Sequence, residues 1–156
     1  EEVLFENFPD NRFDEVALLD IVKAVEQRIE EMGVQVVYTH HGGDLNIDHQ
    51  RTFQAVLTAT RPIGSDFVEE LYAFETLSST EWNLSDQANA FVPNVFCDIG
   101  RTIERKCEAM RCYSSELCDF PHPRSIEGIK ALAKLRGSTA GIEYAEAFRL
   151  IRKIQR

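Results

Sequence analysis

The sequence predicts an α/β fold in which helices flank an open, mostly parallel sheet. Short β-branched runs alternate with segments of helical spacing. The first three segments, at 2–8, between Asp14 and Gly33, and at 34–39, have the patterns of a strand, a helix and a strand. Because such βαβ units build parallel sheets, we expect parallel pairing. The 156 residues, 44% of them hydrophobic, fit a single domain that spans 1–156.

The first half of the chain supplies this unit and the start of another. Residues 2–8 are apolar enough for a strand. Asp14 is the expected N-cap of the following helix, which we expect to stop at Gly33. A second helix is expected to begin near Asp48 and to end before Pro62, since a proline restricts the residue that precedes it.

The rest of the chain contains two further strand patterns and more helical segments. A stiff loop at 120–125 carries two prolines, and Gly137 and Gly141 are expected to divide the last segment into two helices. The predicted strands are 67–76 and 94–99, and the predicted helical segments are 102–117 and 126–156.

The net charge of the chain limits the classes of partner that it is expected to bind. Seventeen basic residues stand against 26 acidic ones, which gives a formal net charge of −9. This balance disfavours binding to a phosphate backbone, so no nucleic-acid partner is expected. No apolar run is long enough for a membrane span, and no signal or transit peptide is recognisable, so we expect a cytoplasmic location.

Chemistry-bearing residues gather in the segment 40–49. It holds His40, His41 and His49, two aspartates, an asparagine and two glycines. The segment follows a predicted strand, and ligands of open α/β sheets bind at the carboxyl ends of strands. His49 falls in the first helical turn, which disfavours imidazolium and leaves the neutral ring that binds metals. The alternative is that Asp48 only caps the helix, that His49 is an exposed first-turn residue and that the glycines only form a turn.

The segment 39–51, Thr-His-His-Gly-Gly-Asp-Leu-Asn-Ile-Asp-His-Gln-Arg, resembles the second signature of the LmbE/PIG-L-like metal-dependent N-deacetylases. The similarity covers nearly the whole chain. It includes four other short segments, which are Phe8-Pro9-Asp10-Asn11-Arg12, His122-Pro123-Arg124-Ser125, Arg136-Gly137 and Ala145-Glu146-Ala147-Phe148.

This resemblance implies a Rossmann-like fold and a hydrolase that removes the acetyl group from an N-acetylated amino sugar. In the family, zinc is held by a histidine and an aspartate of an early His-Pro-Asp-Asp-Glu motif and by a later histidine, which corresponds to His49. The early motif does not occur in this sequence. We therefore expect the family's first one or two βα units to be missing, and the chain to be the C-terminal part of a longer deacetylase domain and inactive alone.

The resemblance also assigns catalytic roles. Asn46 stands where many members of the family have a histidine, so it can donate a hydrogen bond to a developing oxyanion but cannot carry a proton. His40 or His41 could replace that histidine from the same loop. Asp48, next to the predicted ligand, is the second catalytic candidate.

Four residues are the predicted substrate contacts, namely Arg12, Asp44, His122 and Arg124. Trp82 could stack on a sugar face, although a single tryptophan is more often part of a core. Arg12 could equally be a surface arginine. In the alternative for the proline-rich loop, Arg124 pairs with an acid such as Asp119, and His122 caps the loop.

Two other functions remain open at this stage. The chain could be a non-catalytic Rossmann-like fragment or binding module. A nucleotide-binding domain is weakly supported, because neither the GxGxxG nor the GxxxxGK[ST] pattern occurs. Apolar surface left by a missing unit would favour self-association, so a homo-oligomer is also possible.

Overall fold

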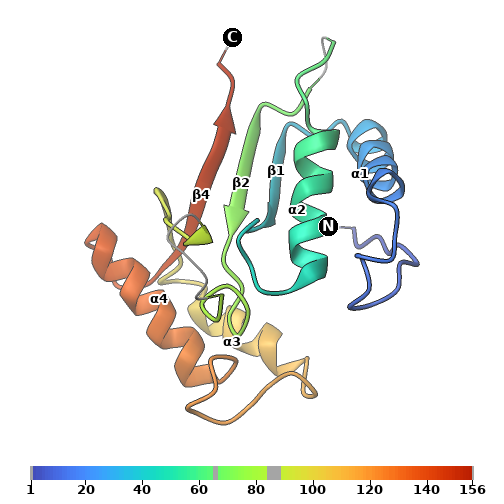
Figure 1. The fold of residues 1–156 in the computed structure, drawn as a ribbon. Coiled ribbons are helices and arrows are strands. Elements are labelled where there is room, and N and C mark those ends of the chain that lie inside the picture. The colour runs from blue at the N-terminus through green and yellow to red at the C-terminus, as the bar shows by residue number, and fades with distance from the viewer. Residues whose placement is uncertain (1, 65–66, 84–88, 156) are drawn as a thin grey trace.

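The computed structural model describes residues 2–64, 67–83 and 89–155. The elements in chain order are α1 (Leu18–Met32), β1 (Val36–His40), α2 (Ile47–Ala59), β2 (Glu70–Phe74), β3 (Val95–Asp98), α3 (Ile103–Arg111), α4 (Ile126–Ala140) and β4 (Ala145–Lys153). The strands form a four-stranded sheet in the order β1-β2-β4-β3 (Figure 1). No helix within the described ranges is long and apolar enough to cross a membrane.

The sheet is mixed, and three of its four strands point the same way. β1 pairs with β2 in parallel, with His40 opposite Phe74. β4 pairs antiparallel with both β2 and β3, and Phe148 lies opposite Phe74 on one side and Val95 on the other. The α/β class and the predominance of one strand direction are therefore confirmed, with β4 as the reversed strand.

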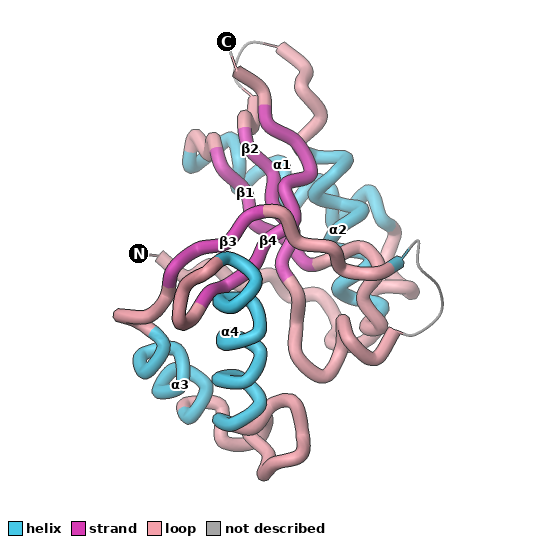
Figure 2. Tube along the Cα trace, turned by 90° about the vertical axis from the view of Figure 1, so that its left-hand side faces the viewer, coloured by secondary structure: helices cyan, strands magenta, loops and turns pink. Residues whose placement is uncertain are grey.

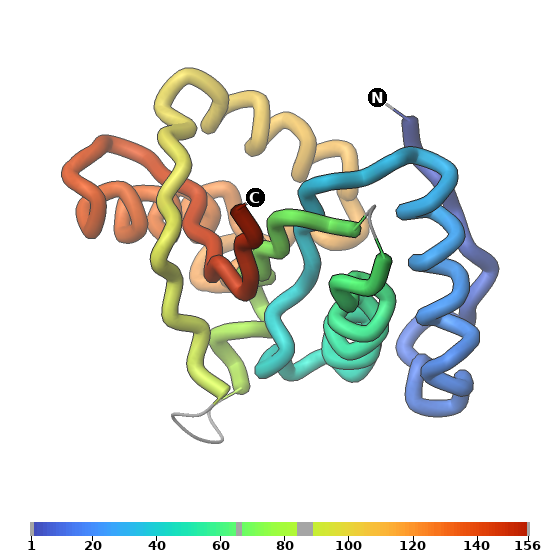
Figure 3. Tube along the Cα trace, turned by 90° about the horizontal axis from the view of Figure 1, so that it is seen from above, coloured from blue at the N-terminus to red at the C-terminus, as the bar shows by residue number. Residues whose placement is uncertain are grey.

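Two helix pairs lie on opposite sides of the strands (Figure 3). α2 packs on β1 and carries α1 on its outer side, whereas α4 packs on β4 and β3 with α3 beside it (Figure 2). The core is correspondingly divided. One buried cluster joins α1 and α2 through Ile21, Val22 and Ala55. The other joins α3 and α4 through Ile103, Cys107 and Ile129.

Local signals explain the ends of several helices. α1 ends at Gly33, whose φ of 61° is the left-handed conformation that glycine adopts without strain, so this expectation is confirmed. Asn46 caps α2 by accepting a hydrogen bond from the Asp48 amide. Ser125 caps α4 in the same way through the Gly128 amide.

Four sequence predictions are wrong. Residues 2–8 pair with no strand and are largely exposed, so the βαβ unit of this chain is β1-α2-β2 rather than one that starts at residue 2. Asp14 does not cap α1, which starts later, at Leu18. α3 ends at Arg111 instead of continuing to 117. The segment after Gly141 is the strand β4 and not a second helix, because its apolar residues are buried by pairing with strands that are distant in the sequence.

Candidate active site

The site lies where β1 and β2 end, at the edge that parallel strands share. The loop after β1 connects to α2, and the segment after β2 folds against this loop. Gly43 permits the close approach of a third segment, because a Cβ atom at this position would lie 2.3 Å from the backbone oxygen of Asn89. Asn83 adds a hydrogen bond of 2.6 Å from its Nδ2 to the Gly43 carbonyl. The sequence thus brings three loops to one place, as expected for an open α/β sheet.

Asp44 is the structural centre of these loops. Its side chain is fully buried and accepts hydrogen bonds from the Asn46 amide at 2.9 Å, from Thr80 Oγ1 at 2.6 Å and from Ser79 Oγ. Burial would raise the pKa of the carboxyl group, but hydrogen bonds from His49, Ser79 and Thr80 outweigh burial and lower this pKa to about 2. Asp44 is therefore ionised at neutral pH.

His49 is held by this carboxylate. Its Nδ1 lies 3.0 Å from Asp44 Oδ1, and an ionised carboxylate can only accept, so Nδ1 carries the proton. In the neutral ring, Nε2 then has the free lone pair, which is the state of a metal-binding histidine supported by a carboxylate. The ring of His49 also stacks on that of His40, with 4.0 Å between the ring centroids and 14° between the planes.

The half-buried ring of His40 predicts a pH-dependent stability. Burial and, to a smaller extent, nearby His49 lower the pKa of His40 from 6.5 to about 4, while Asp44 opposes the shift. The unfolded chain takes up a proton below the ordinary value of 6.5, whereas the folded chain resists protonation down to about 4, so stability falls as pH falls through this window. Between about pH 7 and about pH 4.5, we expect the free energy of unfolding in urea to drop by about 2 kcal/mol more in the wild type than in His40→Phe. Equal drops in the two proteins would contradict this role of His40.

A pocket of about 380 Å³ opens beside His49. It brings together three of the residues singled out in the sequence, Asn46, His49 and Arg124, and it also includes Trp82. The remaining lining residues are Leu45, Thr76, Leu77, Ser78 and Ser79. Hydroxyl groups beside an aromatic ring are a common surface for binding a sugar, because the hydroxyls pair with sugar hydroxyls and the ring covers an apolar sugar face.

Arg124 is anchored rather than free. Its guanidinium pairs with Glu116, not with Asp119, and its Nε donates to Ser78 Oγ. His122 accepts a hydrogen bond from the Arg124 amide at 3.1 Å and packs edge-on against Trp82. The proline-rich loop thus holds Arg124 at the pocket with its Nε and Nη1 groups already paired.

Several predicted residues lie outside the pocket lining. Asp48 accepts hydrogen bonds from the amides of Asn11 at 2.7 Å and Phe13 at 3.0 Å, and so fixes the chain that leads into α1. Arg12 is exposed, 3.7 Å from Glu15. The remaining residues outside the lining are His40, His41, Asp44 and His122.

His41 is one of the two residues that could replace the histidine that the family has at the position of Asn46. It is buried, with Nε2 2.8 Å from the backbone oxygen of Asn89 and its ring against Phe91. Sequence reasoning also missed Ser79 and Thr80, because their segment has no helical or strand period. The only local signal was the density of hydroxyl residues immediately after a strand.

The residues that the structure describes do not form a complete metal centre. No group of three or more histidine, cysteine, aspartate or glutamate side chains among them is placed to hold an ion. His49, with its nitrogen oriented by Asp44, is suitable as one ligand, whereas a catalytic zinc needs about three protein ligands. The fit to zinc is therefore partial, and it rests on this single nitrogen.

Solved structures with the same fold are available for comparison, although no family model and no curated protein matches the sequence. The conserved protein TT1542 from Thermus thermophilus has a TM-score of 0.71 at 21% identity, over 96% of this chain and 65% of that one. The N,N'-diacetylchitobiose deacetylase from Pyrococcus horikoshii has a TM-score of 0.68 at 17% identity, over 93% and 55%. The zinc-inhibited form of teicoplanin deacetylase Orf2 has a TM-score of 0.61 at 15% identity, over 96% and 56%.

Nearly all of this chain superposes on each of these proteins, but it spans only 55% to 65% of their lengths. At identities of 15% to 21%, the likeness shows the fold. Two of the three proteins are deacetylases, as is a further match, the A40926 pseudoaglycone deacetylase Dbv21. The chain has the fold of the LmbE/PIG-L-type deacetylases, the family that its sequence resembles.

Proposed function

We propose that this chain is part of a metal-dependent hydrolase that removes the acetyl group from an N-acetylated amino sugar. The observation that carries the proposal is the buried Asp44–His49 pair, which presents a lone-pair nitrogen beside a sugar-sized pocket at the carboxyl ends of two parallel strands. The deacetylase fold and the resemblance of segment 39–51 support the same activity.

Zinc is the proposed metal, and when bound it would supply Lewis-acid activation of the amide carbonyl and of water. This chain offers His49 as one ligand. The proposal therefore requires two further ligands from outside the described residues. The resemblance places them in a His-Pro-Asp-Asp-Glu motif, which does not occur in this sequence. The chain alone is accordingly proposed to be inactive.

The residues of this chain have distinct proposed roles. The sequence predicted that Asp44 touches the substrate. Because Asp44 is fully buried, we assign it instead to orienting His49. Trp82 would cover a sugar face, and Asn46 would donate a hydrogen bond to the carbonyl oxygen as it gains charge. The sequence predicted Arg12, His122 and Arg124 as cationic substrate contacts. Only Arg124 lines the pocket, so we keep only Arg124 as a proposed substrate contact.

An acetate-release assay on the complete gene product tests the proposal. We expect purified protein to release acetate from N,N'-diacetylchitobiose or N-acetylglucosamine, to lose this activity on treatment with a chelator and to regain it with zinc. The metal-free protein is the internal control.

A non-catalytic binding module is the alternative, favoured by the single metal ligand among the described residues. It would be supported if the zinc-loaded complete product bound the amino sugars without releasing acetate from either. That outcome would refute the deacetylase proposal.

A further inference from the structure

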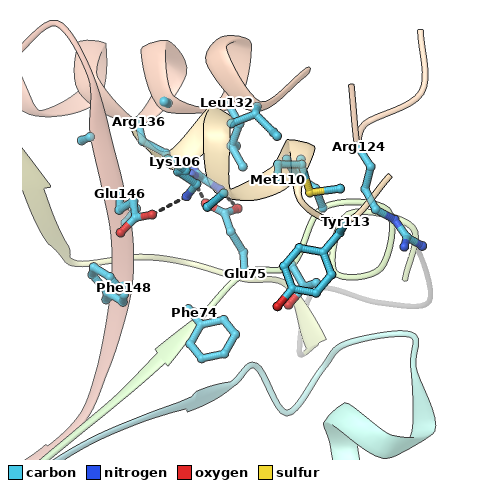
Figure 4. A pocket seen from close by; sticks show the side chains of 17 residues that line it. Phe74, Glu75, Lys106, Met110, Tyr113, Arg124, Leu132, Arg136, Glu146 and Phe148 are labelled. Atoms are coloured by element: carbon cyan, nitrogen blue, oxygen red, sulfur yellow. Dashed lines mark hydrogen bonds and ion pairs between the residues drawn. The ribbon is translucent and has the colours of Figure 1, made fainter. Parts of the chain in front are cut away.

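A second, larger pocket of about 550 Å³ lies between the sheet and the helices α3 and α4. Phe74 of β2 and Phe148 of β4 form one side, and Met110 of α3 and Leu132 of α4 form the other (Figure 4). This volume is within the range of small-molecule sites, whose walls are predominantly apolar. Methionine adds adaptability, because its unbranched side chain adjusts to the shape of a ligand.

The charged side chains in this pocket neutralise one another. Arg136 makes two hydrogen bonds to Glu75, at 2.7 Å and 2.5 Å, and both side chains are at most 20% exposed. Lys106 pairs with Glu146 (Figure 4). Since these four charges are already paired, the pocket presents mainly hydrocarbon to a ligand. An uncharged apolar group fits this wall better than an anion or a cation does.

The two pockets are neighbours. Thr76, Leu77 and Arg124 line both of them. These three residues border both the candidate active site and the apolar pocket, so a ligand that passes over them would occupy both pockets. A ligand bound in this way would place its polar part beside His49 and its apolar part against Phe74 and Phe148.

We propose that the apolar pocket is a subsite for an uncharged hydrophobic aglycone, an alkyl or aryl group carried by the amino-sugar substrate. This inference rests on the proposed function, because the sugar position is taken from the candidate active site. It gives the substrate class as an amphipathic N-acetylglucosamine glycoside rather than a free sugar or a purely polar oligosaccharide.

Calorimetric binding of two glycosides to the metal-free 156-residue chain tests this subsite without turnover. The probes are methyl and octyl N-acetyl-β-D-glucosaminide, the latter kept below its micelle concentration. Burial of each methylene gains about threefold to fourfold in affinity, so partial burial of the octyl chain is expected to give at least about tenfold tighter binding. Equal affinity for the two glycosides would overturn the proposal.

A pair of matched variants locates the binding. Ala109 lines the pocket from an exposed position on α3. The Ala109→Phe variant therefore fills the pocket without placing a larger side chain in the buried core. Ala131 is an exposed helical alanine of α4 that does not line the pocket, and Ala131→Phe is the control. We expect Ala109→Phe to remove the octyl advantage and Ala131→Phe to keep it. An octyl advantage that both variants retain would place the alkyl chain elsewhere and refute the subsite.

Kinetics of the complete gene product separate this inference from the proposed function. The subsite predicts a kcat/KM for octyl glycoside at least about tenfold above that for methyl glycoside, mainly through KM. Acetate release at the same rate from both glycosides would leave the deacetylase intact and refute the subsite, which is the result expected if a further protein segment fills the pocket. Octyl-selective binding with no acetate release from either would instead refute the deacetylase and keep the subsite.

Discussion

Replacing His49 by alanine in the complete gene product is expected to abolish zinc-dependent deacetylation. Among the described residues at the pocket, His49 is the one whose side chain has the geometry of a metal ligand, since Asp44 occupies Nδ1 and leaves Nε2 free. A catalytic zinc with one of about three protein ligands removed is not retained at ordinary concentrations. Acetate release and bound zinc should therefore be lost together, by assay and by elemental analysis.

The matched control for this variant is His122→Ala. His122 is also a histidine near the pocket, but it does not line it and contacts the loop and Trp82 instead. We expect this control to keep its zinc. His49→Ala should remain folded, because Asp44 keeps its hydrogen bonds from Ser79, Thr80 and the Asn46 amide. Full activity in a metal-free His49→Ala protein would refute the assignment of His49.

Local sequence signals were sufficient where a structural feature depends on neighbouring residues. Gly33 and Pro62 bound the first two helices because a glycine in the left-handed conformation and a proline both act within one turn. The concentration of polar residues after β1 indicated the candidate site for a similarly local reason. The loop 40–49 follows a strand whose parallel neighbour ends at the same edge.

Features that depend on distant residues were not predictable in this way. β4 was mistaken for a helix because its two strand partners lie about fifty and more than seventy residues earlier in the chain. The local hydrophobic pattern of β4 does not indicate partners at that distance. Residues 2–8 have the composition of a strand but no partner in the sheet. Ser79 and Thr80 were missed because they donate hydrogen bonds to Asp44, which lies some 35 residues earlier in the chain.

Asn46 has two structural roles that complicate its predicted catalytic one. Its Oδ1 caps α2 by accepting from the Asp48 amide at 2.8 Å, and its Nδ2 lies 3.2 Å from Asn11 Oδ1. A simple alanine variant would remove the cap, at about 1 kcal/mol of stability, together with the donor. Loss of activity in Asn46→Ala would therefore not separate catalysis from folding.

Asn46→Ser separates the two roles, because serine is also a good N-cap but lacks the amide donor. If Nδ2 donates to the oxyanion, kcat of both Asn46→Ala and Asn46→Ser should fall by about 10²–10³-fold, the usual cost of losing one such donor, with KM little changed. Only Asn46→Ala should lose stability in urea, since only that variant loses the cap. Wild-type turnover in Asn46→Ser would mean that Asn46 acts on α2 alone, and the oxyanion would then need a donor from another residue of the pocket.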